Sequence, residues 1–139
     1  MNNISFLKKY QPKYYNNFYI KKDYINLLKT LQQMDNLNIL FIGRKGVGKT
    51  SIILASVREY YKLDLIPKHD VLFINSLKEQ GIQYYRNNLK TFCQTKCSIP
   101  NKKKIIILDD FDFINEQSQQ VFRNYIDKYS HRVNFLISC

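Results

Sequence analysis

Acidic residues are scarce in this sequence. Its 139 residues include 11 Asp and Glu against 22 Lys and Arg, which gives a formal net charge of +11. With so few carboxylates, the charge balance favours an anionic partner such as nucleic acid. A general bias toward Lys, Asn, Ile and Tyr along the chain explains the same excess, so both interpretations stay open on charge alone.

Cysteine is also rare, with only Cys93, Cys97 and Cys139. Three cysteines do not make a disulfide scaffold, and they indicate a reducing compartment. Cys93 and Cys97 have the spacing of half a zinc site. No second pair of ligands lies near them, because His69 and His131 stand alone. We therefore expect structural thiols rather than a metal site.

Long apolar runs are missing as well. No segment approaches the roughly 20 apolar residues that a membrane-spanning helix needs. The sequence shows no signal peptide, internal repeat or low-complexity linker. We expect a soluble intracellular protein with no membrane partner, and its length suits one domain with a real core.

Glycine is scarce too, and most of it is concentrated in residues 43–50, which read G-R-K-G-V-G-K-T. This is the G-x-x-x-x-G-K-[ST] pattern of a phosphate-binding loop. The apolar run at 38–42 predicts a buried strand that enters the loop, and residues 51–57 predict the helix that leaves it. The alternative is an ordinary glycine turn between a strand and a helix.

The chemistry of a phosphate loop explains these residue types. Glycines let the backbone amides converge on one point, and the helix N-terminus adds partial positive charge there. Lys49 is placed to reach the β- and γ-phosphates, and Thr50 to ligate Mg²⁺. The sequence thus predicts a site for ATP and Mg²⁺, with these nucleotide-binding residues: Gly43, Gly46, Val47, Gly48, Lys49, Thr50 and Ser51.

A second motif occupies residues 105–110, which read I-I-I-L-D-D. A buried apolar strand that ends in paired carboxylates is typical of a Walker B motif. Asp109 is expected to hold the Mg²⁺ through its water shell, and Asp110 to polarise the attacking water. Asp110 and Lys49 are therefore the candidate catalytic residues. The alternative is a strand followed by an acidic turn.

Apolar strands alternate with amphipathic helices along the whole chain. Asp23 and Asn115 are the expected N-caps of two of the helices. The strands are apolar on both faces, which predicts a three-layer α/β fold around a parallel sheet of about four strands. Such sheets bind ligands at the carboxyl ends of their strands. Helices are expected at 24–34, 51–61, 80–94 and 116–129, and strands at 38–42, 71–74, 105–108 and 133–137.

These residues resemble the N-terminal nucleotide-binding part of a replication factor C small subunit. Such subunits are AAA+ P-loop ATPases that load sliding clamps onto DNA. The family's start, E-K-Y-R-P-K, matches residues 8–13, and its helix V-R-N-x-I-K matches residues 85–90. Further matches are at 43–50, 73–76 with 81–82, 106–112, 118–123 and 127–130.

The resemblance implies two regions, an adenine-covering segment with the first helix at 1–37 and an AAA+ core at 38–139. It implies that Arg86 contacts the DNA backbone inside a ring of subunits, with Lys90 joining it one helical turn later. A solvated helix face is the alternative for both. The adenine pocket would be lined by Tyr10, Pro12, Tyr19 and Ile20.

The function implied by the resemblance is that of an ATP-binding clamp-loader subunit that uses ATP binding and hydrolysis to load a clamp on primer–template DNA. Its partners would be sibling AAA+ subunits, a sliding clamp and DNA, in a nucleus or at a viral replication site. A non-hydrolysing structural subunit of such a ring is one alternative. Another is a different AAA+ nucleic-acid ATPase, such as an initiator or a Holliday-junction motor.

Five positions depart from the family pattern. Gln11 and Gln80 replace family arginines, and Gln80 removes one expected DNA contact. Arg44 and Lys45 replace the usual prolines of the phosphate loop. Asp110 stands where the family has Glu, which shortens the carboxylate by one methylene. Because the attacking water must be placed accurately, ATP binding is expected to survive while hydrolysis is weak.

The family pattern continues beyond Cys139 with a sensor asparagine, an S-R-C motif with its arginine finger, a fifth strand, a helical lid and a collar. In the family's sheet the first strand lies between the fourth and the fifth. We therefore expect the strand at 38–42 to be an exposed edge, and ATPase activity only in the full-length assembled complex.

Overall fold

The computed structural model of the protein describes residue 5, residues 9–75 and residues 82–139. Within these ranges no helix has the length and apolar character to cross a membrane. The elements, in chain order, are η1 (Tyr15–Asn17), α2 (Lys22–Gln33), β1 (Ile39–Phe41), α3 (Lys49–Tyr61), β2 (Val71–Asn75), α4 (Ile82–Gln94), β3 (Lys104–Asp109), η2 (Phe111–Phe113), α5 (Glu116–Tyr129) and β4 (Val133–Ser138).

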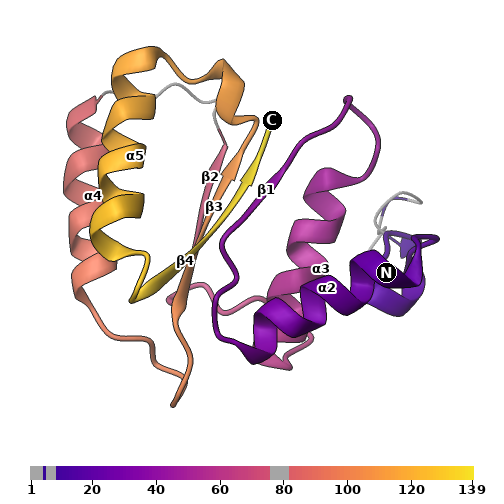
Figure 1. The fold of residues 1–139 in the computed structure, drawn as a ribbon. Helices are drawn as coiled ribbons and strands as arrows, with labels where there is room; N and C mark the ends of the chain where they lie inside the picture. The colour runs from indigo at the N-terminus through magenta and orange to yellow at the C-terminus, as the bar shows by residue number, and fades with distance from the viewer. Residues whose placement is uncertain (1–4, 6–8, 76–81) are drawn as a thin grey trace.

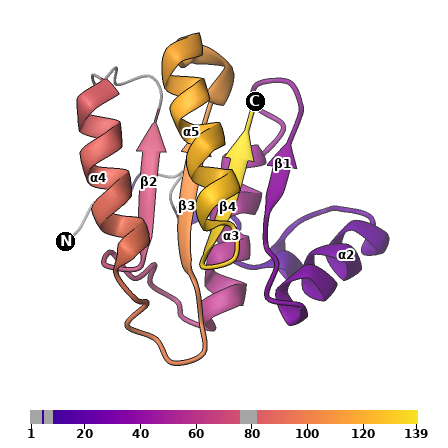
Figure 2. The same cartoon turned by 60° about the vertical axis from the view of Figure 1, so that its left-hand side comes forward.

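The strands form one parallel sheet in the order β1-β4-β3-β2. Figure 2 shows the four arrows side by side and pointing the same way, so all carboxyl ends lie at one edge. Ile107 of β3 is paired with Phe73 of β2 and with Leu136 of β4. The predicted four-stranded parallel α/β sheet is confirmed.

Helices cover both faces of the sheet, with α4 and α5 on one side and α2 and α3 on the other (Figure 1). Successive residues of β3 supply the two cores. Ile106 and Leu108 pack with residues of α4 and α5, whereas Ile105 and Ile107 pack with residues of α3. A central strand covered on both faces must be apolar at every position, which is why β3 reads as a continuous apolar run.

The edge strand β1 is only half buried. It pairs with β4, and Ile39 and Phe41 pack against the clusters beneath α3. Leu40 is 52% exposed and Ile42 is 77% exposed. The prediction of an exposed edge is therefore confirmed. The prediction of a buried strand at 38–42 is wrong at Leu40 and Ile42, because β1 is the edge strand of the sheet.

The two predicted N-caps had different outcomes. Asn115 caps α5, since its side-chain oxygen accepts a hydrogen bond from the Ser118 amide at 2.8 Å. Asp23 does not cap α2, because the helix begins earlier and Lys21 occupies the cap position without a side-chain bond. Asp23 instead lies in the first turn, where its charge suits the helix dipole. The expected start of α4 at Gln80 lies outside the described residues.

Tyr15 fastens the N-terminal segment to α3. Its fully buried ring has a hydroxyl that donates to the Ser56 hydroxyl at 3.0 Å and accepts from the Gln32 amide at 2.6 Å. Its backbone amide donates to the Glu59 carboxylate at 3.2 Å. Burial raises the pKa of Tyr15 to about 12, so the hydroxyl stays protonated. This contact holds α2 and the segment before it against the helix that follows the phosphate loop.

The cysteines are free thiols. Cys93 is fully buried in the core cluster beneath α4 and α5. Burial raises the pKa of the Cys93 thiol to about 11, which keeps it protonated and unreactive. Cys93 is thus the structural thiol that the sequence predicts. Among the described residues, no group of three or more His, Cys, Asp or Glu could hold a metal ion.

A buried carboxylate joins the start of β2 to the loop before β3. Asp70 is 1% exposed, and its side chain accepts hydrogen bonds from the Ser98 amide at 2.9 Å and from the Ser98 hydroxyl. Burial by itself would raise the pKa of Asp70. The two Ser98 hydrogen bonds, helped by Cys97 and by the charge of Lys104, outweigh burial and hold the pKa of Asp70 below its ordinary value.

We expect Asp70→Asn to lower the free energy of unfolding at pH 7 by about 1–3 kcal/mol, because it removes a charged acceptor from a buried site. A lowered folded-state pKa stabilises the protein above the unfolded-state pKa, and this contribution is lost as the pH falls through the folded-state value. The difference between wild type and variant should therefore shrink below about pH 4 in urea titrations. A difference that stays constant down to pH 2 would contradict this account.

Candidate nucleotide site at the carboxyl edge of the sheet

The phosphate loop joins β1 to α3 at the carboxyl edge of the sheet (Figure 1). Gly46 and Gly48 have φ angles of +80° and +91°, a region that residues with a Cβ rarely adopt. Gly48 is also the N-cap residue of α3, and the helix begins at Lys49. These two glycines therefore allow the chain to turn into the helix, whose free amides then face the loop.

Gly43 is required for a different reason. A Cβ at this position would lie 3.1 Å from Cγ2 of Val47, which is tighter than an ordinary contact. The Gly43 amide donates to the Cys139 carbonyl at 3.2 Å, and the Cys139 amide donates to the Phe41 carbonyl at 3.0 Å. The loop thus begins as a continuation of the pairing between β1 and β4, and it folds closely over its own side chains.

The ammonium of Lys49 lies between the loop and the end of β4. Its Nζ donates to the Cys139 carbonyl at 3.0 Å and also to the Gly43 carbonyl. Both acceptors are neutral. A phosphate oxygen forms a stronger, charge-assisted hydrogen bond with an ammonium, so phosphate would compete well for Lys49.

Asp109 links three elements at this edge. The Thr50 hydroxyl of α3 lies 3.1 Å from both carboxylate oxygens, and the Ser138 hydroxyl of β4 donates to one of them at 2.6 Å. The Asp110 amide donates to the Ser138 hydroxyl at 3.0 Å. Sequence reasoning missed Ser138, whose only signal is a polar residue at the end of an apolar strand.

Asp110 has an unusual backbone conformation. It follows β3 with φ 53° and ψ 49°, in the left-handed region, and it occupies the N-cap position of η2. A residue other than glycine is held there at a cost of about 1 kcal/mol or more, and such residues gather at functional sites. The structure thereby brings Asp110 and Asp109 to the same edge as Lys49 and Thr50.

These residues fit a nucleoside triphosphate with Mg²⁺. Around Gly46 and Gly48 no atom lies within 4 Å of where a Cβ would be, so phosphate has room to approach the backbone there. The Thr50 hydroxyl and the Asp109 carboxylate supply the oxygen ligands that Mg²⁺ prefers. Such a metal would be completed by water and phosphate oxygens, as is usual for Mg²⁺ beside a nucleotide.

Three of the four predicted adenine-covering residues are exposed. Tyr10 is 62% exposed, Tyr19 is fully exposed, Ile20 is exposed and Pro12 is half buried. The segment nevertheless reaches the site, because the Gln11 amide donates to the Ser51 hydroxyl at 3.4 Å. The contact places residue 11 beside the first turn of α3. The adenine-covering role therefore stays a prediction.

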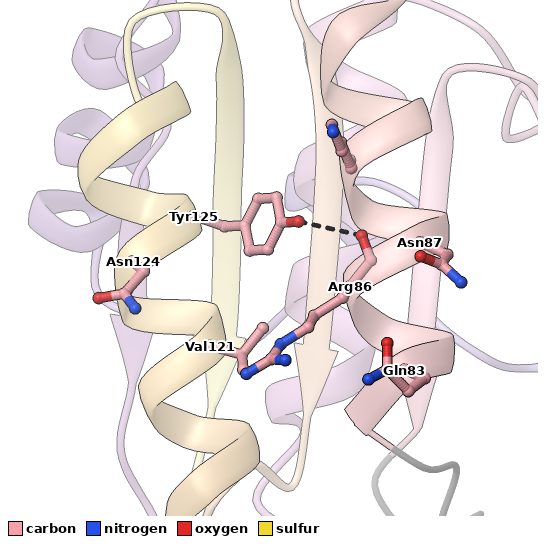
Figure 3. A pocket seen from close by; sticks show the side chains of 7 residues that line it. Gln83, Arg86, Asn87, Val121, Asn124 and Tyr125 are labelled. Carbon is pink, nitrogen blue, oxygen red and sulfur yellow. Dashed lines mark hydrogen bonds between the residues drawn. The ribbon is translucent and has the colours of Figure 1, made fainter.

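The predicted DNA-contacting residues lie elsewhere, on the opposite face of the sheet. Arg86 and Lys90 are exposed on α4. Figure 3 shows the Arg86 guanidinium reaching toward Val121 of α5, and the Tyr125 hydroxyl donates to the Arg86 carbonyl at 3.0 Å. Both cations line a groove of about 360 Å³ between α4 and α5, together with Gln83, Asn87, Val121, Asn124 and Tyr125.

Comparison with known proteins gives strong matches. Residues 39–139 match the family described as "ATPase family associated with various cellular activities (AAA)". The replication factor C small subunit of Sulfolobus acidocaldarius is 31% identical over 137 residues, covering 98% of this chain and 42% of the relative. Replication factor C subunit 4 of Homo sapiens is 33% identical over 144 residues, covering 98% of this chain and 39% of the relative. The chain thus spans about 40% of the length of these relatives.

Solved structures agree on the fold. The RuvB Holliday junction branch migration motor of Thermotoga maritima superposes with a TM-score of 0.62 at 12% identity, covering 93% of this chain and 41% of that one. PCH-2 of C. elegans superposes with a TM-score of 0.55 at 17% identity, covering 84% of this chain and 35% of that one. At such identities the likeness shows the fold alone. Because the family match covers residues 39–139, this chain belongs to the AAA ATPase family, and over 98% of its own length it resembles the N-terminal part of replication factor C small subunits.

Proposed function

We propose that this chain is the ATP-binding part of a clamp-loader subunit, which uses ATP binding and hydrolysis to load a sliding clamp onto primer–template DNA. The hydrogen-bonded cluster of Thr50, Asp109 and Ser138 beside Lys49 carries this proposal. Support also comes from the similarity to replication factor C subunits along nearly the whole chain.

In the proposed site, this chain's own groups bind and orient the nucleotide. The loop amides and the Lys49 ammonium hold the phosphates, and Thr50 and Asp109 hold Mg²⁺. When bound, Mg²⁺ neutralises charge on the phosphate oxygens. Asp110 orients the attacking water, and its position is set by the left-handed backbone and by the bond from its amide to Ser138.

The exposed edge of β1 supports the proposal that the nucleotide-binding core is completed by further residues. Leu40 and Ile42 are more than half exposed, and a bare apolar edge strand is prone to pair with another chain. Because the chain spans about 40% of its relatives' length, we propose that in the whole protein a following strand pairs with β1. Activity is therefore to be measured on the full-length protein in its assembled complex.

The partner proposal is tested by affinity purification of the full-length protein. A sliding clamp and sibling AAA+ ATPases should co-purify with it. A structural subunit would bring down the same partners while showing no ATP turnover of its own. Recovery of a different replication or recombination complex without a clamp would contradict the clamp-loader assignment.

Substitutions at Asp110 test whether this residue takes part in ATP hydrolysis. Its carboxylate is one methylene shorter than the family's Glu, so we expect Asp110→Glu to raise the single-turnover rate by about 10- to 100-fold. ATP affinity should stay within about twofold, because Asp110 acts on the water rather than on the phosphates. Lys49→Ala is the control that abolishes binding. A wild-type rate that is unchanged by Asp110→Asn would refute a catalytic role for Asp110.

DNA contact is tested on the groove between α4 and α5. Arg86→Ala and Lys90→Ala should each weaken DNA binding by similar factors for all sequences, because phosphate contacts carry no sequence information. Each should also reduce the slope of log affinity against log salt by about 1. Lys29→Ala is the matched control, since Lys29 is an exposed cation of α2 on the other side of the sheet. An equal effect of Lys29→Ala would show that only overall charge matters.

A further inference from the structure

The phosphate loop carries a second lysine that contacts an aromatic ring. The Nζ of Lys45 lies 5.3 Å from the ring centroid of Phe113, within the range of a cation–π interaction. Phe113 is 51% exposed and belongs to η2, the short helix that follows the carboxylate pair. This contact therefore joins the phosphate loop to the segment that carries Asp109 and Asp110.

The ring of Phe113 is carried by a well-anchored turn. The Phe113 amide donates to the Asp110 carbonyl at 3.0 Å, and the Asp110 amide is itself bonded to Ser138. Phe111, at the start of the same turn, packs edge-to-face against Phe122 in the core, with ring centroids 6.0 Å apart. Since the turn is tied to both the sheet and α5, Phe113 is a firm support for the long side chain of Lys45.

We infer that Lys45 is a second phosphate-binding cation, which Phe113 holds on the carboxylate side of the loop. The inference rests on the proposed nucleotide site. A polyphosphate bound in the loop would extend from the loop amides toward Asp109, because Thr50 and Asp109 would hold its metal. The Lys45 ammonium lies next to the turn that begins with Asp110, and so on the side that the terminal phosphates would occupy.

The aromatic contact gives Lys45 a property that its neighbour lacks. A lysine side chain that moves freely loses conformational entropy when it binds an anion. A lysine that is already held in place loses less, so it binds the anion more tightly. Arg44 carries the same charge one position earlier and is exposed, and it makes no aromatic contact with any described residue. Lys45 should therefore favour nucleotides with terminal phosphates, and Arg44 should not.

The test compares nucleotide affinities by calorimetry in the full-length protein. Lys45→Met should weaken ATP binding by about tenfold and leave AMP binding unchanged. Arg44→Gln, with the same loss of charge, should stay within about twofold. Phe113→Leu should weaken ATP binding by about two- to fivefold and add nothing in the Lys45→Met background, because the two residues act as one unit.

A tryptophan beside Lys45 supplies a second readout, because residues 1–139 contain none. Phe113→Trp keeps an aromatic ring that binds cations strongly, and full-length protein without this substitution gives the background emission to subtract. The emission of the Phe113→Trp variant should change on ATP addition, and this change should disappear in the Lys45→Met background. Thermal unfolding of each variant checks that it is folded.

Three results would overturn the inference. They are equal losses in Arg44→Gln and Lys45→Met, full additivity of Phe113→Leu and Lys45→Met, and wild-type ATP affinity in Lys45→Met. Failure of the proposed function looks different, because wild-type protein would then bind no ATP or would bind it equally well after Lys49→Ala.

Discussion

The carboxylate of Asp109 is the point on which the candidate site depends. It accepts hydrogen bonds from Thr50 of α3 and from Ser138 of β4 while its own strand lies in the middle of the sheet. Asp109 is paired in register with Asn75, and Leu108 with Ile137. A slip of one residue would turn every side chain of β3 to the opposite face. The two apolar cores therefore set the position of this carboxylate as well as the stability of the fold.

The phosphate loop takes its position from the same edge. Lys49 and Gly43 both bond to the Cys139 carbonyl at the end of β4, so the loop is attached to the strand beside Asp109. Gly46 and Gly48 supply the backbone freedom that this attachment requires. The loop's conformation thus follows from two anchors, the sheet before it and α3 after it, with glycine only where the chain must turn sharply.

Much of this could be predicted from sequence, since strand periodicity, helix caps and both phosphate-site motifs are local signals. Asn115 capped α5 as expected because a cap needs only its own next turn. Leu40 was misjudged, because an apolar run does not tell an edge strand from a central one. Ser138 and Phe113 act through contacts between segments far apart in the chain, which no local pattern contains. The adenine-covering role of Tyr10 came from family resemblance alone and stays a prediction.

Two of the departures from the family pattern, Lys45 and Asp110, would act in the same direction within the proposed function. Lys45 adds positive charge to the phosphate loop, and such charge stabilises bound phosphate before as well as during the reaction. Uniform stabilisation of this kind strengthens binding without accelerating chemistry. The short carboxylate of Asp110 affects only the placement of water, which matters in the transition state. Under the proposed function, we therefore expect a subunit that holds ATP tightly and hydrolyses it slowly, and that contributes bound nucleotide to a ring more than hydrolysis.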